Sequence, residues 1–401
     1  MSAAKTKQNI SLNQLPPGKN IPGTAIVVDA FKYRNPDFLY FLSHFHQDHY
    51  GGITKNWSDG PIYCSQITAR LLRHVLDVPE QYIKSLPQNE PVDLNAECRV
   101  TLMDANHCPG AHVLIFDVKT DESVKRYVHC GDMRYEARMK CWPSWFRDGA
   151  LVDVETVFLD TTYCNPRYKF PKQDVVTAAD DTPPLAQAQR RTLFVVATYT
   201  IGKEKVLHEI STACGDLCIY TSPDKKEILN LLDLPYANIF VREPRESSVH
   251  MITWGKLGEM VPGGWRFLPN WGFAQEYLDW ANSLLSDDVP KFTHLAGIVP
   301  TGWTWEFQKQ HGTGSLFHCT MKPGQEHLCI YEVPYSEHSN FEELREFVEF
   351  LKPARVVPTV VGKSGNAGKL AGYFRDLVDS RKSFQLGFND LFAGEWTFNF
   401  S

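Results

Sequence analysis

The feature that most constrains this chain is a cluster of histidines and one acid directly after an apolar strand pattern. The segment FLYFLSHFHQDHYGG places His44, His46, Asp48 and His49 within six positions and ends in two glycines. Residues two apart in an extended chain point the same way, so His44 and His46 can converge on one ion. A turn would then direct Asp48 and His49 toward a second ion. Imidazoles and a carboxylate suit zinc, so the spacing predicts a metal site rather than a solvated loop.

Four residues of one loop cannot complete two coordination shells, so further ligands must come from other segments. Three candidates follow apolar runs at similar positions: His107 before a Pro-Gly turn, Asp132 after Gly131, and His338 before a helical pattern. Each of them alone would more often be an ordinary loop residue. Together with the first cluster, they are the predicted additional ligands.

Composition narrows the class of protein. The 401 residues are 43% hydrophobic and 22% charged, which is typical of globular proteins and excludes a collagen-like or wholly disordered chain. The formal charge is −6, so any affinity for nucleic acid must come from basic residues concentrated locally. The sequence has no apolar run of membrane-spanning length, and its first residues lack the apolar segment of a signal peptide. We therefore expect a soluble, intracellular protein with no membrane partner.

Strand and helix patterns divide the chain into segments. Residues 1–20 are polar and are expected to form a disordered tail, and polar residues 172–191 predict a linker. Short β-branched or aromatic runs before the linker predict strands, whereas apolar strands after it alternate with helical stretches, as in α/β units. The clearest helix begins near Phe341, where Ser339 and Glu342 form a capping-box pattern.

These motifs resemble the metallo-β-lactamase superfamily. HFHQDH matches its HxHxDH signature, and Asp29 in VVDAF, His107 and Asp132 match its other motifs in order. The later segments are similar to the β-CASP branch, and more narrowly to the DNA cross-link repair nucleases of the Artemis and Apollo group; they are LDTTYCNPRYKFP, ATYTIGKEK, PTGWTW, PYSEHSNF and VVPTVVG. Gln47 and Met133 depart from residues frequent in the family, but neither side chain is a ligand.

The resemblance implies an α/β protein with a four-layer αββα metallo-β-lactamase fold and an inserted α/β β-CASP domain. We expect the metallo-β-lactamase domain at residues 21–170 and 321–401 and the β-CASP insertion at residues 171–320. The groove between these parts would hold the metals and, because the net charge is negative, would have to concentrate the basic residues that bind DNA.

The resemblance also implies a ligand set for one or two Zn²⁺ ions, with Mg²⁺ or Mn²⁺ as alternatives. One ion would lie among His44, His46 and His107, and Asp132 would bridge it to a second ion. The ligands implied for the second ion are Asp48, His49 and His338. Two such ions can lower the pKa of a shared water, orient it and stabilise both oxygens of a phosphodiester under attack.

Two more acids are implied to act beside the ligands. Asp29 would orient a histidine N–H, or alternatively cap the turn at a strand end. Asp160, in LDTT, would act similarly, or alternatively form a local cap with Thr162. The predicted catalytic residues are therefore Asp48, Asp132, Asp29 and Asp160.

A strand–turn–helix unit predicts a phosphate-binding loop. Residues 198–202 lie between a predicted strand and a helix that begins at Lys203, and free backbone N–H groups at such a terminus suit a phosphate. The alternative is an ordinary turn followed by a solvated lysine, and the resemblance favours phosphate binding. The predicted phosphate-binding residues are Thr198, Tyr199, Gly202, Lys203, Ser336 and Ser339.

The function implied by the resemblance is that of a metal-dependent DNA nuclease. The expected enzyme is a nuclear, 5′-phosphate-dependent 5′-to-3′ exonuclease that acts on single strands or duplex ends in interstrand cross-link or double-strand break repair. The alternative is a β-CASP RNA-processing endonuclease. Val360 favours DNA, because the resemblance implies valine at this position in DNA enzymes and histidine in RNA enzymes. A small-molecule hydrolase would not need a second lobe, and a silent scaffold would have lost ligands.

Overall fold

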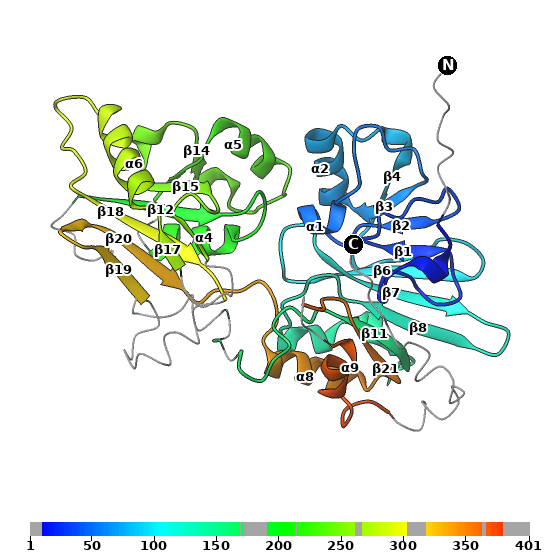
Figure 1. Cartoon of the computed structure of the whole chain (residues 1–401). Helices are drawn as coiled ribbons and strands as arrows, with labels where there is room; N and C mark the ends of the chain where they lie inside the picture. Colours follow the sequence, from blue (N-terminus) through cyan, green and yellow to red (C-terminus); the bar gives the residue numbers. More distant parts are fainter. Residues whose placement is uncertain are drawn as a thin grey trace, which may run out of the picture.

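The computed structural model describes residues 10–168, 170, 171, 173, 191–213, 215, 217–260, 267–302, 318–362 and 366–379. Figure 1 shows two lobes. The first contains the blue and cyan strands, the green segment that follows them and the orange and red elements after residue 338, and the second contains the segment between residues 191 and 333, coloured from green to orange. The chain thus leaves the first lobe and returns to it, which brings segments far apart in the sequence to one junction.

The first lobe contains two large sheets. The smaller is parallel, with the order β1-β2-β3-β4, and the larger is mixed, with the order β21-β11-β8-β7-β6-β5. Strand β21 comes from the C-terminal part and pairs in parallel with β11. The strands are β1 (Ile26–Val28), β2 (Leu39–Phe41), β3 (Ile62–Ser65), β4 (Ile83–Leu86), β5 (Pro91–Asp93), β6 (Cys98–Asp104), β7 (His112–Lys119), β8 (Val124–His129), β11 (Val154–Leu159) and β21 (Arg355–Pro358).

Alternating strand residues build cores on both faces of these sheets. Val28 and Phe116 lie in the core between the sheets, whereas Ile115 points to the opposite face. This period of two follows from strand geometry. Helix α2 (Gln66–Leu76) and helix α8 (Phe341–Leu351) both contribute residues to the same cluster of buried side chains as Ile115. Figure 1 shows these helices on opposite outer faces of the pair of sheets. The predicted order of helix, sheet, sheet and helix is confirmed.

The second lobe is a seven-stranded sheet covered by helices on both faces. Its order is β14-β13-β15-β12-β18-β20-β19, and the pairs are parallel except β19 with β20. Val196 packs on the face with α4 and α5, and its neighbour Val195 packs on the face with α6. The elements are β12 (Thr192–Thr198), α4 (Glu204–Ala213), β13 (Ile219–Tyr220), α5 (Pro223–Asn230), β14 (Phe240–Val241), β15 (Val249–Thr253), α6 (Trp271–Ser283), β18 (His294–Pro300), β19 (His318–Lys322) and β20 (Gln325–Val333).

Short elements complete the described part of the chain. The short helices and hairpin strands are α1 (Gln47–Tyr50), β9 (Phe146–Arg147), β10 (Ala150–Leu151), β16 (Gly258–Met260), β17 (Phe267–Pro269) and α9 (Ala367–Gly372). The 3₁₀ helices are Leu12–Gln14, Glu80–Tyr82, Ala137–Cys141, Pro143–Trp145, Ala237–Ile239 and Pro244–Glu246. Among the described residues, no helix combines the length and apolar character needed to cross a membrane.

The structure places the return from the insertion later than the predicted residue 321. Strands β19 and β20 pair within the seven-stranded sheet as far as Val333. The chain re-enters the first lobe with the segment that carries His338 and α8. An apolar strand does not reveal which sheet it joins, so the pattern alone could not place β20. Most of the predicted linker at 172–191 lies outside the described residues.

The described part of the predicted tail packs on the first lobe. Leu15 is 7% exposed. The carbonyl of Gly18 accepts a hydrogen bond from Nε2 of buried His129 at 3.0 Å, and the carbonyl of Lys19 accepts one from the N–H of Val28 at 2.9 Å. Backbone groups make these contacts, so a polar composition does not reveal them. Residues 1–9 lie outside the described part of the chain.

The capping box of α8 lies one residue later than predicted. Asn340 accepts a hydrogen bond from the N–H of Glu343 at 2.9 Å, and the Glu343 carboxylate accepts one from the N–H of Asn340 at 2.9 Å. The hydroxyl of Ser339 instead accepts from the N–H of Tyr135 at 2.9 Å and donates to the carbonyl of Met133 at 2.8 Å. Ser339 therefore ties the start of α8 to the loop that contains Asp132.

Candidate metal centre

Three histidines and one carboxylate converge where the two lobes meet. Nδ1 of His46 lies 3.0 Å from Nε2 of His44 and 3.1 Å from Nε2 of His107. Oδ2 of Asp132 lies 3.6 Å from Nε2 of His44 and 3.7 Å from Nε2 of His107. Donor atoms bound to one tetrahedral zinc ion at about 2.1 Å lie about 3.4 Å apart. The spacing of these four donors therefore fits a single ion.

The same carboxylate faces a second group of donors. Oδ2 of Asp132 lies 3.2 Å from Nε2 of His49, and this nitrogen lies 3.6 Å from Oδ2 of Asp48. His338 offers a ring nitrogen that lies within 4.8 Å of donor atoms of both His107 and Asp132. The structure thus brings together all seven predicted ligands, with Asp132 between the two groups.

In each of the five histidines, the ring nitrogen that faces away from the cluster contacts a protein oxygen. For the first group, the contacts are His44 Nδ1 with the Ser43 hydroxyl at 3.0 Å, His46 Nε2 with the Ile201 carbonyl at 3.1 Å, and His107 Nδ1 with the Glu337 carbonyl at 2.7 Å. Such contacts set the tautomer and the direction of the ring. Ile201 belongs to the inserted lobe, so both lobes orient the ligands.

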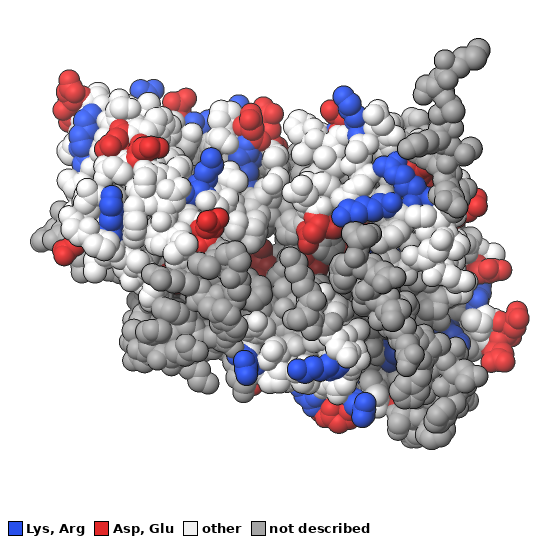
Figure 2. Space-filling view, viewed as in Figure 1, with Lys and Arg blue, Asp and Glu red and all other residues white. Residues whose placement is uncertain are grey.

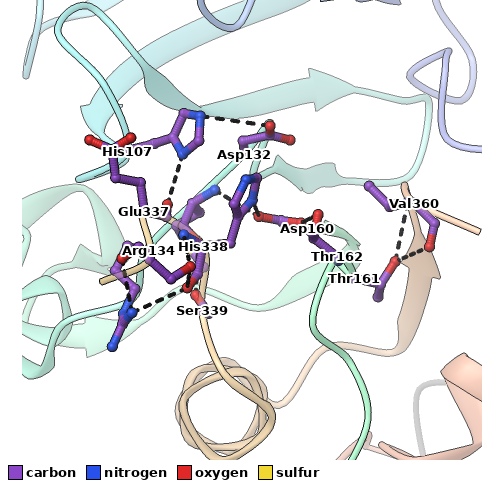
Figure 3. A network of polar contacts seen from close by, with 12 residues as sticks. His107, Asp132, Arg134, Asp160, Thr161, Thr162, Glu337, His338, Ser339 and Val360 are labelled. Carbon is purple, nitrogen blue, oxygen red and sulfur yellow. Dashed lines mark hydrogen bonds and ion pairs between the residues drawn. The ribbon is translucent and has the colours of Figure 1, made fainter. Parts of the chain in front are cut away.

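Carboxylates orient the two remaining histidines. Oδ2 of Asp29 accepts a hydrogen bond from Nδ1 of His49 at 2.8 Å, and its Oδ1 accepts one from the N–H of Ser43. Oδ2 of Asp160 accepts one from Nδ1 of His338 at 2.8 Å (Figure 3). Each acid therefore contacts a histidine, and for Asp160 the alternative of a local cap holds as well, whereas Asp29 also bonds Ser43, fourteen residues along the chain. The cap of Asp160 uses the other oxygen, which accepts from the N–H and hydroxyl of Thr162.

The electrostatics of the cluster favour a bound cation. Burial lowers the pKa of His44, His46 and His107, so these imidazoles are neutral and can donate a lone pair. Burial alone would also lower the pKa of His49 and His338. The neighbouring carboxylates outweigh it and raise the pKa of His49 well above its usual range and that of His338 to about 9. Positive charge is therefore stabilised here, and the donor set fits a metal ion.

Cys108 also lies among the first group of donors. Its Sγ and the donor atoms of His44, His46 and His107 all lie within 4.8 Å of one another. Burial, reinforced by the carboxylate of Glu337, raises the pKa of this thiol well above its usual range. The thiol therefore keeps its proton in the metal-free protein, and the candidate ligands remain the histidines and Asp132 that the resemblance implies.

Binding of Zn²⁺ to the metal-free protein is expected to release protons. His338 has a pKa of about 9 and the pKa of His49 is also raised, so both imidazole rings are positively charged at neutral pH. Each ring must lose one proton before it can bind a metal ion. The affinity for Zn²⁺ should therefore rise with pH until the pH passes about 9, where His338 has already lost its proton. Calorimetry measures the released protons. Equal binding heats in Tris and phosphate buffers at pH 7 would contradict the expectation.

Comparison with known proteins identifies the family. A family model described as DNA repair metallo-beta-lactamase matches residues 236–364, which include His338. The DNA cross-link repair protein SNM1 of Arabidopsis thaliana is 38% identical over 365 residues, which are 89% of this chain and 69% of that protein. The chain belongs to the SNM1 family of DNA cross-link repair proteins.

Two other similar proteins are matched over a smaller share of their length. The DNA ligase 6 of Arabidopsis thaliana is 40% identical over 399 residues, which cover 95% of this chain and 26% of that protein. The 5′ exonuclease Apollo of Gallus gallus is 31% identical over 347 residues, which cover 86% of this chain and 64% of that protein. The chain thus spans about a quarter of one of these relatives and less than two thirds of the other.

The predicted phosphate-binding loop of this SNM1-family chain already has protein partners. The N–H of Gly202 donates to both carboxylate oxygens of Glu204, at 3.0 and 2.8 Å, and the N–H of Lys203 donates to Oε1 of Glu337 at 2.6 Å. Lys203 is 5% exposed, and its ammonium group donates to the carbonyl of Pro300. The prediction of free N–H groups is therefore wrong. A local sequence pattern cannot show that a carboxylate from a distant segment accepts the hydrogen bond of an N–H group at the start of a helix.

The other predicted phosphate-binding residues are mostly buried. Thr198 and Ser339 are each 1% exposed. Ser336 is 4% exposed, and its hydroxyl is hydrogen-bonded to the backbone of His338 at 3.0 Å. These hydroxyls therefore do not form the open phosphate site that was predicted. Tyr199 alone among the six residues keeps a large exposed fraction, 40%.

Arg134 is a positioning residue whose role no motif in the sequence predicts. Its guanidinium donates to the carbonyl of Ser336 at 3.0 Å and to the carboxylate of Glu343 at 2.9 Å (Figure 3 shows this side of the site). The guanidinium also lies 4.9 Å from the ring centroid of Phe170. Arg134 therefore holds the segment that carries His338 against the first lobe.

Replacement of Asp160 by alanine is expected to weaken Zn²⁺ binding by about 10- to 100-fold, because Nδ1 of His338 loses its acceptor. Thr162→Val is the matched control, since it removes only a hydroxyl that donates to the other oxygen of Asp160. Competition with a fluorescent zinc chelator measures both variants. An affinity of Asp160→Ala equal to that of the wild type would show that the carboxylate does not support His338.

Proposed function

We propose that this chain is a Zn²⁺-dependent DNA nuclease that removes nucleotides from 5′ ends, in the 5′-to-3′ direction, during nuclear repair of interstrand cross-links or double-strand breaks. The observation that carries the proposal is the convergence of seven donor side chains. In each of the five histidines among them, the outer ring nitrogen contacts a protein oxygen. Membership of the SNM1 family supports DNA repair, and similarity to the 5′ exonuclease Apollo supports the direction of cleavage.

The side chains divide into ligands and positioning residues. In this proposal, one ion would be held by His44, His46, His107 and Asp132, and a second ion would be held by Asp48, His49 and His338 together with Asp132. Two divalent ions supply an activated water and stabilise negative charge on a phosphodiester. Asp29 and Asp160 keep a proton on Nδ1 of His49 and His338, so that Nε2 presents its lone pair to the centre.

Charge on the visible surface bears on how DNA would be attracted. Figure 2 shows Lys and Arg scattered among Asp and Glu over the described part of this face, and acidic side chains beside the hollow where the lobes meet. On this face the described residues do not form the concentrated basic groove that was expected. The ions of the centre would add positive charge where the phosphate binds.

Val360 supports DNA over RNA as the substrate. Its side chain is 37% exposed. Its backbone is fixed by Thr161, whose hydroxyl donates to the Val360 carbonyl at 2.6 Å and accepts from the Val360 N–H at 3.1 Å (Figure 3). A valine side chain offers no hydrogen-bonding group to a 2′-hydroxyl, which is the group that distinguishes RNA from DNA.

Digestion of end-labelled oligonucleotides tests this function. The protein with Zn²⁺ should shorten 5′-phosphorylated single-stranded DNA from its 5′ end, and should act more slowly on 5′-hydroxyl DNA and on matched RNA. Removal of the metal by a chelator should abolish cleavage, and Zn²⁺ should restore it. Cleavage of RNA with DNA left intact would instead support the RNA-processing endonuclease. Internal cuts as the first products would exclude an exonuclease.

A further inference from the structure

We propose that Tyr199 and Trp254 form a stacking platform for a nucleobase of the substrate strand at the rim of the metal centre, an inference that rests on the proposed function. Tyr199 follows directly after β12 and is 40% exposed. Its ring centroid lies 6.2 Å from that of the candidate ligand His46. A base on this ring would therefore place the phosphate of the same or the adjoining nucleotide near the centre.

The platform is fixed by its neighbours. The ring centroids of Tyr199 and Trp254 lie 5.0 Å apart with planes at 35°, and the N–H of Trp254 donates to the carbonyl of Thr198 at 2.6 Å. The buried ammonium of Lys203 lies 4.7 Å from the Tyr199 centroid and 4.2 Å from the Trp254 centroid. Cation–π attraction of this kind holds both rings in place. Rings that are already ordered lose little entropy when a ligand binds.

The loop around Tyr199 suits a neutral base better than a phosphate. The N–H groups of Gly202 and Lys203 are occupied by the carboxylates of Glu204 and Glu337. The carbonyls of Tyr199 and its neighbour Thr200 both accept from the ammonium of Lys225, which is itself 3.6 Å from Glu204. The backbone N–H groups of the loop are therefore not available to a phosphate, whereas an aromatic ring stacks on any of the four bases. The subsite should therefore require a base but accept any base.

Kinetics on intact and base-free substrates test the platform. The full chain loaded with Zn²⁺ is given 5′-phosphorylated DNA whose first two nucleotides carry bases, or the same DNA with tetrahydrofuran residues there. Tyr199→Leu should raise KM for the normal DNA about tenfold, with a smaller change in kcat, and should leave KM for the base-free DNA unchanged. Tyr199→Phe should retain the wild-type KM, because it keeps the ring. Phe146→Leu is the matched control, since Phe146 is 42% exposed and lies in the first-lobe hairpin strand β9.

Two results would overturn the platform: an unchanged KM of Tyr199→Leu for normal DNA, or an equal rise for the base-free DNA. Failure of the proposed function gives a different pattern, in which the wild-type protein cleaves neither substrate. In that case, fluorescence anisotropy with labelled oligomers measures DNA binding and still tests the stacking platform. Tyr199→Leu should bind normal DNA about tenfold more weakly than the wild type and base-free DNA equally well. Equal binding of normal DNA by the two proteins would contradict it.

Discussion

Replacement of Asp132 by alanine is expected to lower nuclease activity by at least about 1,000-fold, because a metal centre supplies several kcal/mol of transition-state stabilisation and each 1.36 kcal/mol is tenfold in rate. Oδ2 of Asp132 lies 3.2 Å from Nε2 of His49 and 3.6 Å from Nε2 of His44. This single oxygen thus faces both groups of donors. Single-turnover cleavage of labelled DNA and elemental analysis of bound zinc measure the loss.

The control for this variant is Asp93→Ala. The side chain of Asp93 is 65% exposed and is paired with Arg99 in the strands β5 and β6. Surface pairs of this kind contribute little to stability, so Asp93→Ala should retain both activity and zinc. Thermal unfolding followed by circular dichroism should show that Asp132→Ala is still folded. Wild-type activity in folded Asp132→Ala would exclude a role for this carboxylate in the reaction.

Replacement of Arg134 by methionine is expected to lower the free energy of unfolding by about 3–5 kcal/mol, because it leaves a buried charge without its partner. The side chains of Arg134 and Glu343 are 2% and 7% exposed, respectively, and lie 2.9 Å apart. The guanidinium also donates to the backbone carbonyls of Ser336 and Pro171. The same variant should bind Zn²⁺ more weakly, since the segment that carries His338 loses its main anchor.

Arg138→Met is the matched control for this prediction. The side chain of Arg138 is 65% exposed and pairs with Glu136, which is 33% exposed. An exposed pair contributes up to about 1 kcal/mol, so Arg138→Met should unfold almost as the wild type does. Urea unfolding of the metal-free proteins compares the two variants. If Arg134→Met and Arg138→Met lowered the free energy of unfolding equally, the buried pair would not be the anchor described here.

The positions of the candidate ligands could be predicted from sequence because each one lies next to an element that the apolar pattern reveals. The candidate ligands His44 and Asp132 come soon after β2 and β8, and Asp160, which orients His338, comes soon after β11, the parallel neighbour of β8. The carboxyl ends of parallel strands meet at one edge of a sheet, so the side chains that follow them gather there. His338 could be added because it immediately precedes a helix with a clear apolar period.

The groups that orient the ligands could not be predicted in the same way. The partners of His46 and His107 are the backbone carbonyls of Ile201 and Glu337, and every residue has such a carbonyl. The wrong prediction of a phosphate-binding loop has a related cause. Its backbone has the expected strand–turn–helix form, but Glu337 reaches it from 134 residues away in the sequence. Contacts of this kind depend on how the two lobes meet, which periodicity does not encode.

An anomalous difference map at the zinc edge, from crystals of the full chain grown with Zn²⁺, shows directly whether the seven side chains bind metal. Two peaks about 3.5–4 Å apart are expected on either side of the Asp132 carboxylate. One peak should lie among His44, His46 and His107, and the other beside His49 and His338. Zinc bound elsewhere on the chain, with no peak within reach of Asp132, would contradict the metal centre and the nuclease function together.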